Sequence, residues 1–267
     1  MPIAHHLRFT LDNEAVIAST PEQRRDLART VLKHGQGDAG LLSFGQADNH
    51  LHVIAACDRE RAGRLARAIS TGLGYCLQLA VGFAPAYIGA VDDQRHLNNA
   101  FDYPFRQQAR HGLSWDPLFE ASNLADLLGL RLLGRYSVAR VRQLLPRLTR
   151  PRLLQLLGVP ELAPAARPDG DLLAATLRAA ALPSLWVKSH DAVAARRAML
   201  EVARGHVPLR HLAEQLHISE RAAYKLLRQP AQPEFVTAIR LQLDLAARVR
   251  VLAEAAFVEP LVARAAR

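Results

Sequence analysis

The sequence predicts an α+β protein, in which a ferredoxin-like βαββαβ sandwich is followed by an all-α region. Residues 4–112 switch between strand-like alternation and helical spacing in the order strand, helix, strand, strand, helix, strand, helix. This is the split βαβ pattern. From about residue 123 only helical spacing remains. Charge divides at the same place: residues 1–120 carry 12 Lys/Arg and 13 Asp/Glu, a net of −1, whereas residues 121–267 carry 22 and 12, a net of +10.

We therefore expect two parts, 1–120 and 121–267. With 50% hydrophobic residues the chain can bury a sizeable core, and the basic second part is typical of proteins that meet a polyanion, most simply DNA. An arginine-rich solvated surface is the alternative. Two cysteines exclude a disulfide scaffold and suit a reducing compartment. No stretch is typical of a signal peptide or a membrane span, so we expect a cytoplasmic, nucleoid-associated protein with no membrane partner.

Each element of the first part has a local signal. Thr20 is placed to cap a helix, with Pro21 at its first position and Gln23 at the capping-box position. Ala47-Asp48-Asn49 has turn chemistry and predicts a hairpin. Asp58 is placed to cap the next helix. The expected strands are 4–11, 40–46, 50–57 and 85–91, and the expected helices are 20–34, 58–81 and 92–112.

The second part reads as helices joined by short breaks. Pro146 and Pro151 interrupt a long leucine- and arginine-rich stretch, because proline removes a helical hydrogen bond. Residues 159–171 are rich in proline and glycine and read as a linker. The expected helices are 124–133, 138–157 in two pieces, 172–181, 191–205, a helix-turn-helix at about 208–229, and a long last helix from about 233.

The strand at 50–57 begins with His50-Leu51-His52. Alternate side chains of a strand share a face, so His50 and His52 point the same way and Leu51 points into the core. Two imidazoles on one face are half of a divalent-metal site. A strand with two solvent-facing histidines is the plainer alternative.

A helix about fifty residues downstream carries Tyr103 and Gln107, four apart and so on one face. If that face lies on the histidines, the site has two imidazole nitrogens and one amide oxygen as metal ligands, beside a phenol that can attack phosphorus. Pro104 directly follows the phenol. It disfavours helical backbone at Tyr103 and predicts that the helix starts or kinks there.

These motifs resemble the single-tyrosine HUH transposases, including the REP-associated tyrosine transposases. The marks of that family read here as Asn49-His50-Leu51-His52, Tyr103-Pro-Phe-Arg-Gln107 and Arg110-His111-Gly112-Leu113, within a resemblance that covers roughly residues 5–115. It implies that Tyr103 cuts single-stranded DNA and forms a 5′-phosphotyrosine link. It further implies that His50, His52 and Gln107 bind Mg²⁺ or Mn²⁺, and it allows a monomer or a homodimer.

Residues 209–228 resemble a helix-turn-helix, with apolar spacing, a small Ala213 at the crossing and Ser219 as the second helix's cap. An ordinary helical hairpin is the alternative. The second helix offers side chains suited to phosphates and base edges. The expected DNA-contacting residues of the whole chain are Asn49, Arg106, Arg110, Arg210, Ser219, Arg221, Tyr224, Lys225 and Arg228.

The leading interpretation is a metal-dependent tyrosine nickase that transfers single-stranded or hairpin DNA, with a helical region that holds duplex. The alternative is a domesticated DNA-binding regulator that has lost catalysis, which Pro104 would explain. A third possibility, a hydrolase using His50 and His52, needs carboxylate ligands that do not stand out near these histidines.

Overall fold

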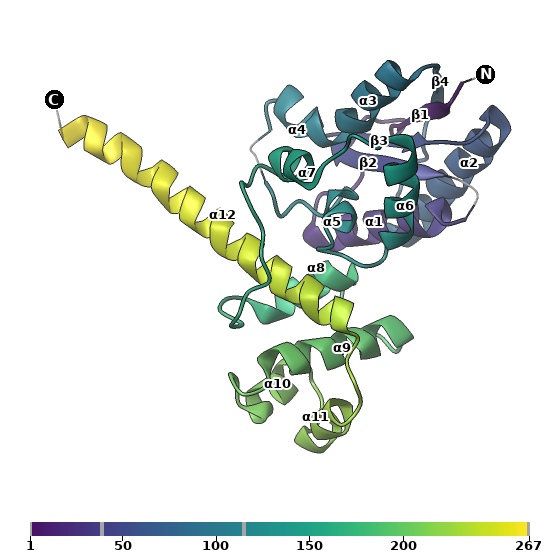
Figure 1. Cartoon of the computed structure of the whole chain (residues 1–267). Coiled ribbons are helices and arrows are strands. Elements are labelled where there is room, and N and C mark those ends of the chain that lie inside the picture. Colours follow the sequence, from purple (N-terminus) through teal and green to yellow (C-terminus); the bar gives the residue numbers. More distant parts are fainter. Residues whose placement is uncertain (1, 38–39, 114–115, 266–267) are drawn as a thin grey trace.

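The computed structural model describes residues 2–37, 40–113 and 116–265, and it is an α+β protein (Figure 1). One antiparallel sheet has the strand order β2-β3-β1-β4. The predicted class, with strands in the first part and helices alone in the second, is confirmed. The strands are β1 (Ala4–Phe9), β2 (Leu41–Ala47), β3 (His50–Ala55) and β4 (Tyr87–Val91).

Helices α1 (Pro21–Gly35) and α2 (Arg59–Cys76) cover one face of the sheet (Figure 1). The predicted capping box at the start of α1 is present, since Thr20 accepts from the backbone of Gln23 and the Gln23 side chain reaches back to Thr20. Helix α2 ends five residues before the expected Val81, because Gln78 turns into the left-handed region at φ 50° and leaves the helical path.

The opposite face is covered by a helical segment that changes type twice. It runs as α3 (Gln94–Asp102), the 3₁₀ turn η1 (Tyr103–Arg106) and α4 (Gln107–Arg110). Asp93 caps α3 by accepting from the backbone N–H of His96 at 2.7 Å. The single helix expected over 92–112 is therefore divided, because Pro104 lacks the N–H that an unbroken α-helix would use.

Three helices from beyond residue 120 complete this second face: α5 (Leu124–Leu127), α6 (Arg135–Leu144) and α7 (Arg150–Leu157). Their side chains share one core with Ala4, Ile54 and Val91 of the sheet. The α5 helix is one turn instead of the expected 124–133, because Gly129 adopts a φ of 79° and ends it. The boundary at residue 120 stays a prediction, and side-chain packing continues across it. We call β1–β4 with α1–α7 the sheet lobe.

The remaining helices form what we call the helical lobe, with a core of its own. Its last helix begins in that core, contributes Leu241 and Leu245 to the sheet-lobe core, and then projects away from both (Figure 1). No helix among the described residues is long and apolar enough to cross a membrane. The helical lobe consists of α8 (Leu172–Ala180), α9 (His190–Ala203), α10 (Leu209–Gln215), α11 (Glu220–Leu227) and α12 (Pro233–Ala265).

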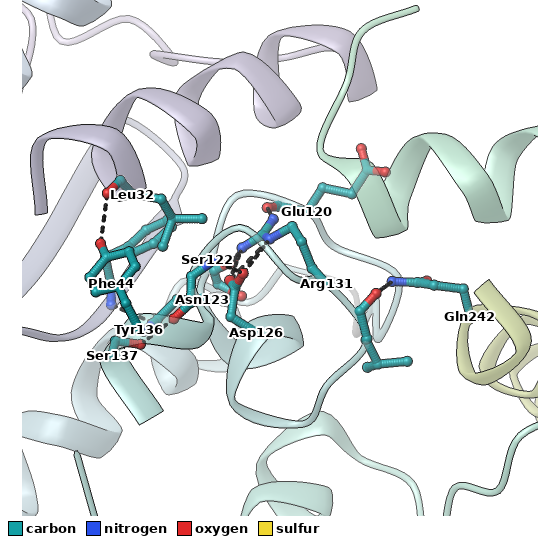
Figure 2. A network of polar contacts seen from close by, with 12 residues as sticks. Leu32, Phe44, Glu120, Ser122, Asn123, Asp126, Arg131, Tyr136, Ser137 and Gln242 are labelled. Carbon is teal, nitrogen blue, oxygen red and sulfur yellow. Dashed lines mark hydrogen bonds and ion pairs between the residues drawn. The ribbon is translucent and has the colours of Figure 1, made fainter. Parts of the chain in front are cut away.

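A buried polar network fastens the segment after residue 120 in place (Figure 2). Arg131, only 2% exposed, pairs with Asp126 at 2.5 Å and donates to backbone carbonyls of Glu120 and Ser122. Gln242 of α12 donates to the carbonyl of Leu130 at 3.0 Å, next to this cluster. Because a buried charge is costly unless it is paired and hydrogen-bonded, Arg131 holds the loops around it in one arrangement.

Candidate active site

Two histidines of β3 share the sheet face that α3 and η1 cover. The imidazoles of His50 and His52 are parallel within 1°, with ring centroids 5.9 Å apart. His52 is 3% exposed, and its cross-strand neighbours are Gly45 on β2 and Arg8 on β1. The same-face arrangement expected from the strand period is therefore present, although His52 is buried and does not face solvent.

Gly45 lets η1 and α4, which we call the tyrosine segment, approach the sheet closely. A Cβ atom at this position would lie 2.6 Å from the carbonyl oxygen of Pro104, which is closer than real contacts allow. Directly opposite residues of a sheet share a face, so Pro104 occupies the space next to His52 that any side chain on Gly45 would fill.

The phenol of Tyr103 lies against the histidines. Its ring meets the ring of His52 edge-on, with centroids 5.0 Å apart at 89°, and the ring of His6 at 5.4 Å and 65°. The guanidinium carbon of Arg110 lies 5.1 Å from the centroid of the Tyr103 ring. The structure thus brings together, within one chain, the phenol and an imidazole that the sequence placed on separate segments.

Pro104 does not remove Tyr103 from helical backbone. Tyr103 has φ −56° and ψ −48°, and the change of helix type falls in the turn that contains Pro104. Gln107 follows one turn later, 2% exposed, and its Nε2 donates to the backbone carbonyl of Tyr103 at 3.1 Å. Its role as a third metal ligand, through Oε1, stays a prediction.

His6 belongs to this cluster and was not among the expected site residues. Its Nε2 forms a hydrogen bond with Nδ1 of His52 at 3.0 Å. Its neighbour His5 faces the other way and donates from Nδ1 to the carbonyl of Cys57 at 2.9 Å. Alternation along β1 puts His6 and Arg8 on one face. The antiparallel register that aligns them with β3 depends on tertiary structure and cannot be seen in the sequence.

Burial keeps these imidazoles neutral. Desolvation, with smaller contributions from His6, His50 and nearby cations, lowers the pKa of His52 to about 3. Desolvation and then the charge of Arg8 lower the pKa of His6 to about 4. The pKa of His50 is lowered by the same two causes. Neutral imidazole is the form that binds a metal ion, since its lone pair is free.

The two imidazoles of β3 each keep a ring nitrogen that is available to a divalent ion. Nδ1 of His50 is buried and has no hydrogen-bond partner, and the His52–His6 bond leaves Nε2 of His52 for a ligand. Among the described residues, no group of three or more His, Cys, Asp or Glu side chains is placed to hold a metal. Any ion here would therefore need the oxygen of Gln107 or of a substrate phosphate as a further ligand.

The expected DNA contacts of the sheet lobe lie around this site. Asn49 is in the β2–β3 turn, next to His50. Arg106 is exposed and pairs with Asp102 at 2.9 Å, and Arg110 covers the Tyr103 ring. Arg106 and Arg110 thus lie on the same helical segment as Tyr103.

The other expected contacts lie in the helical lobe, on α10, α11 and their joining turn (Figure 1). His217 takes a φ of 51° at the position where glycine is usual, and the ring of Trp186 packs against it with centroids 4.5 Å apart. Ser219 caps α11 by accepting from the N–H of Ala222 at 3.2 Å. Arg221 and Lys225 are exposed. Arg228 lies over the Tyr224 ring at 5.7 Å, and Arg210 pairs with Glu214 at 3.1 Å.

Comparison with known proteins adds little to this geometry. No family model matches the chain, and no curated protein matches it. Among solved structures the chain is similar to a REP-associated tyrosine transposase bound to a REP hairpin, with 15% identity and a TM-score of 0.35, over 43% of this chain and 72% of that chain. A likeness at this level carries no argument, so the function has to be argued from the site.

Proposed function

We propose that this chain cleaves and rejoins single-stranded DNA through a covalent link to Tyr103. The observation that carries the proposal is the edge-on packing of the Tyr103 phenol against the buried, neutral imidazole of His52. A nucleophile and two candidate metal ligands on one sheet face, from segments fifty residues apart, are the parts that phosphodiester transfer needs.

The reaction exchanges one phosphoester for another. The Tyr103 hydroxyl oxygen forms a bond to phosphorus as the bond from phosphorus to the 3′ oxygen breaks. The phenolic proton passes to solvent, and the departing 3′ oxygen gains a proton. The products are a 5′-phosphotyrosine and a free 3′-hydroxyl, and the reverse reaction rejoins a strand without a nucleotide cofactor. Arg110 places a positive charge over the Tyr103 ring, which favours the deprotonated phenol as its proton leaves.

His50 and His52, with Gln107, would hold the Mg²⁺ or Mn²⁺ ion. Such an ion would supply Lewis-acid polarisation of the phosphate. His6 is a positioning residue, because its hydrogen bond to Nδ1 of His52 fixes the tautomer and the orientation of that ring.

The topology supports the same assignment. The strand order β2-β3-β1-β4, all antiparallel, is that of a ferredoxin-like sandwich, and it places the histidine pair on an inner strand. The HUH type of that sandwich is our interpretation of the His-Leu-His strand and the tyrosine helix taken together.

We further propose that α10 and α11 form a helix-turn-helix that holds duplex DNA. Helix α11 presents Arg221, Tyr224 and Lys225 on an exposed face, next to a tight turn between two short helices. This arrangement can place the N-terminal part of α11 in a major groove.

A covalent-capture assay tests the function. The full chain is mixed with Mg²⁺ or Mn²⁺ and a labelled hairpin oligonucleotide with single-stranded flanks, and protein is separated under denaturing conditions. We expect a protein–DNA adduct that Tyr103→Phe abolishes. Tyr75→Phe is the matched control, because this exposed tyrosine lies on α2, which covers the other face of the sheet, and it should leave the adduct unchanged.

Other results would favour the alternatives. Tight duplex binding with no adduct from the wild-type chain would favour the regulator. Metal-dependent cleavage that persists in Tyr103→Phe would favour a hydrolase.

A further inference from the structure

A cleft beside Tyr103 is walled by residues from both sides of residue 120. Its volume is about 680 Å³. One wall is α3 with the tyrosine segment, and the other is the α6–α7 connection with the first turn of α7. Four arginines line it, two from each wall: Arg106 and Arg110, and Arg147 and Arg152.

The cleft has an excess of positive charge. Asp102 is the acidic residue among those lining it, and it is shared by Arg106 at 2.9 Å and Arg152 at 2.5 Å. Arg147 is exposed, and within residues 2–37, 40–113 and 116–265 neither it nor Arg110 has an ion-pair partner. Four guanidinium groups against one carboxylate leave a net of about +3 along one cleft, which attracts phosphate.

The cleft has room for part of a nucleic-acid strand. A volume of this order holds about one or two nucleotides. The lining also includes the amides of Asn98 and Asn99, which can both donate to and accept from base edges. Leu148 contributes a partly buried apolar side chain, and Phe101 lies buried beneath the lining. These are the components of a site for single-stranded nucleic acid.

We propose that this arginine cleft, formed by Arg106, Arg110, Arg147 and Arg152, binds the sugar–phosphate backbone of the single strand flanking the phosphate that Tyr103 attacks. The inference rests on the proposed function, since it names the substrate path of the same site. It assigns a substrate role to the α6–α7 connection, which the sequence places in the duplex-binding part. Arg147 and Arg152 act there as strand-positioning residues.

Binding is measured by fluorescence anisotropy of a labelled oligothymidylate, with the full chain carrying Tyr103→Phe so that no covalent product forms. Arg147→Glu should weaken binding about tenfold or more, and Arg147→Ala should reduce the slope of log affinity against log salt by about 0.7, which is one phosphate contact on a single strand.

The matched control is Arg142→Glu. This variant makes the same change of charge as Arg147→Glu. Arg142 is exposed on α6, but it lines a different cavity that faces α12. We expect its effect to be under about twofold. Equal losses of affinity for Arg142→Glu and Arg147→Glu would contradict the proposal, because they would mean that only net charge matters.

A second variant works in the opposite direction. Asp102→Asn removes the carboxylate shared by two of the arginines while keeping the size of the side chain. Strand affinity should rise about threefold. A purely structural role for this ion-pair cluster predicts unchanged or weaker binding, and that result would contradict the proposal.

The proposed strand binding and the proposed covalent mechanism can be tested separately. If wild-type protein forms no adduct but Arg147→Glu selectively weakens strand binding, strand binding by the cleft is supported and the covalent mechanism is contradicted. If Arg147→Glu forms adduct with unchanged KM for the oligonucleotide, strand binding by the cleft is contradicted and the covalent mechanism is supported.

Discussion

The two lobes present their candidate functional residues in opposite ways. In the sheet lobe the candidate site is assembled by tertiary contacts: a histidine pair from β3, a third histidine from β1 and a phenol that reaches them because Gly45 has no side chain. In the helical lobe the DNA-contacting candidates lie close together in sequence, on two short helices and at their ends. Under the proposed function, catalysis would depend on burial and precise packing, whereas duplex binding would depend on accessible charge.

The largest expected difference between the lobes is their response to acid. His6 and His52 stay neutral in the folded state because burial lowers their pKa to about 4 and about 3, whereas the unfolded chain titrates them near 6.5. The unfolded state therefore binds more protons between about pH 6.5 and 4, and stability falls as the pH falls through that range. At pH 5 each histidine should cost about 2 kcal/mol of the free energy of unfolding.

Chemical denaturation in EDTA at pH 7 and pH 5 measures this loss, and His6→Asn with His52→Asn should flatten it. A pH dependence unchanged in the double variant would contradict the burial argument.

Gly45→Val should impair the candidate active site of the sheet lobe without affecting the helical lobe. The new side chain meets the Pro104 carbonyl and pushes η1 from the sheet, so Tyr103 loses its position. We expect the rate of adduct formation to fall about 100-fold, because a misplacement of about 1 Å has that cost, while duplex affinity stays unchanged. Gly74→Val on α2 is the control, since an added Cβ there meets nothing within 4 Å. Equal losses in both variants would mean that Gly45 has no special role.

His6→Gln tests positioning within the sheet lobe. Loss of the hydrogen bond to His52 Nδ1 should raise the Mn²⁺ concentration needed for half-maximal adduct formation about 10- to 100-fold, with a smaller change at saturating metal. A uniform loss at every metal concentration would show that His6 acts on something other than the metal ligand.

The smallest expected effects are on α11. Arg221→Ala and Lys225→Ala should each weaken duplex binding about tenfold and lower the salt slope by about 0.9, with single-strand affinity unchanged. Gel-shift titrations at several salt concentrations measure both. Arg140→Ala, on α6 outside the helical lobe, is the control.

The sequence predicted what depends on local periodicity or capping. It placed His50 and His52 on one face, the capping box at Thr20 and the two short helices around His217. It missed what depends on register and packing. The contact of His6 with His52 follows from the pairing of β1 with β3, and the position of Arg147 follows from the packing of α6 and α7 against the sheet.

Pro104 shows the limit of a local rule. Proline chemistry predicts a broken helix, and the chain does change helix type there, yet Tyr103 keeps helical dihedral angles. The rule identified the position of the irregularity but not how little the backbone would deviate.

Helix α12 has a mechanical consequence. It contributes side chains to both hydrophobic cores, and Gln242 ties it to the carbonyl of Leu130 (Figure 2). A helix packed into both lobes keeps the distance between them constant. If α11 binds the stem of a DNA hairpin, the unpaired flank would reach Tyr103 at a fixed number of nucleotides from the stem. The cleavage position would then be set by distance and would not depend on the bases in between.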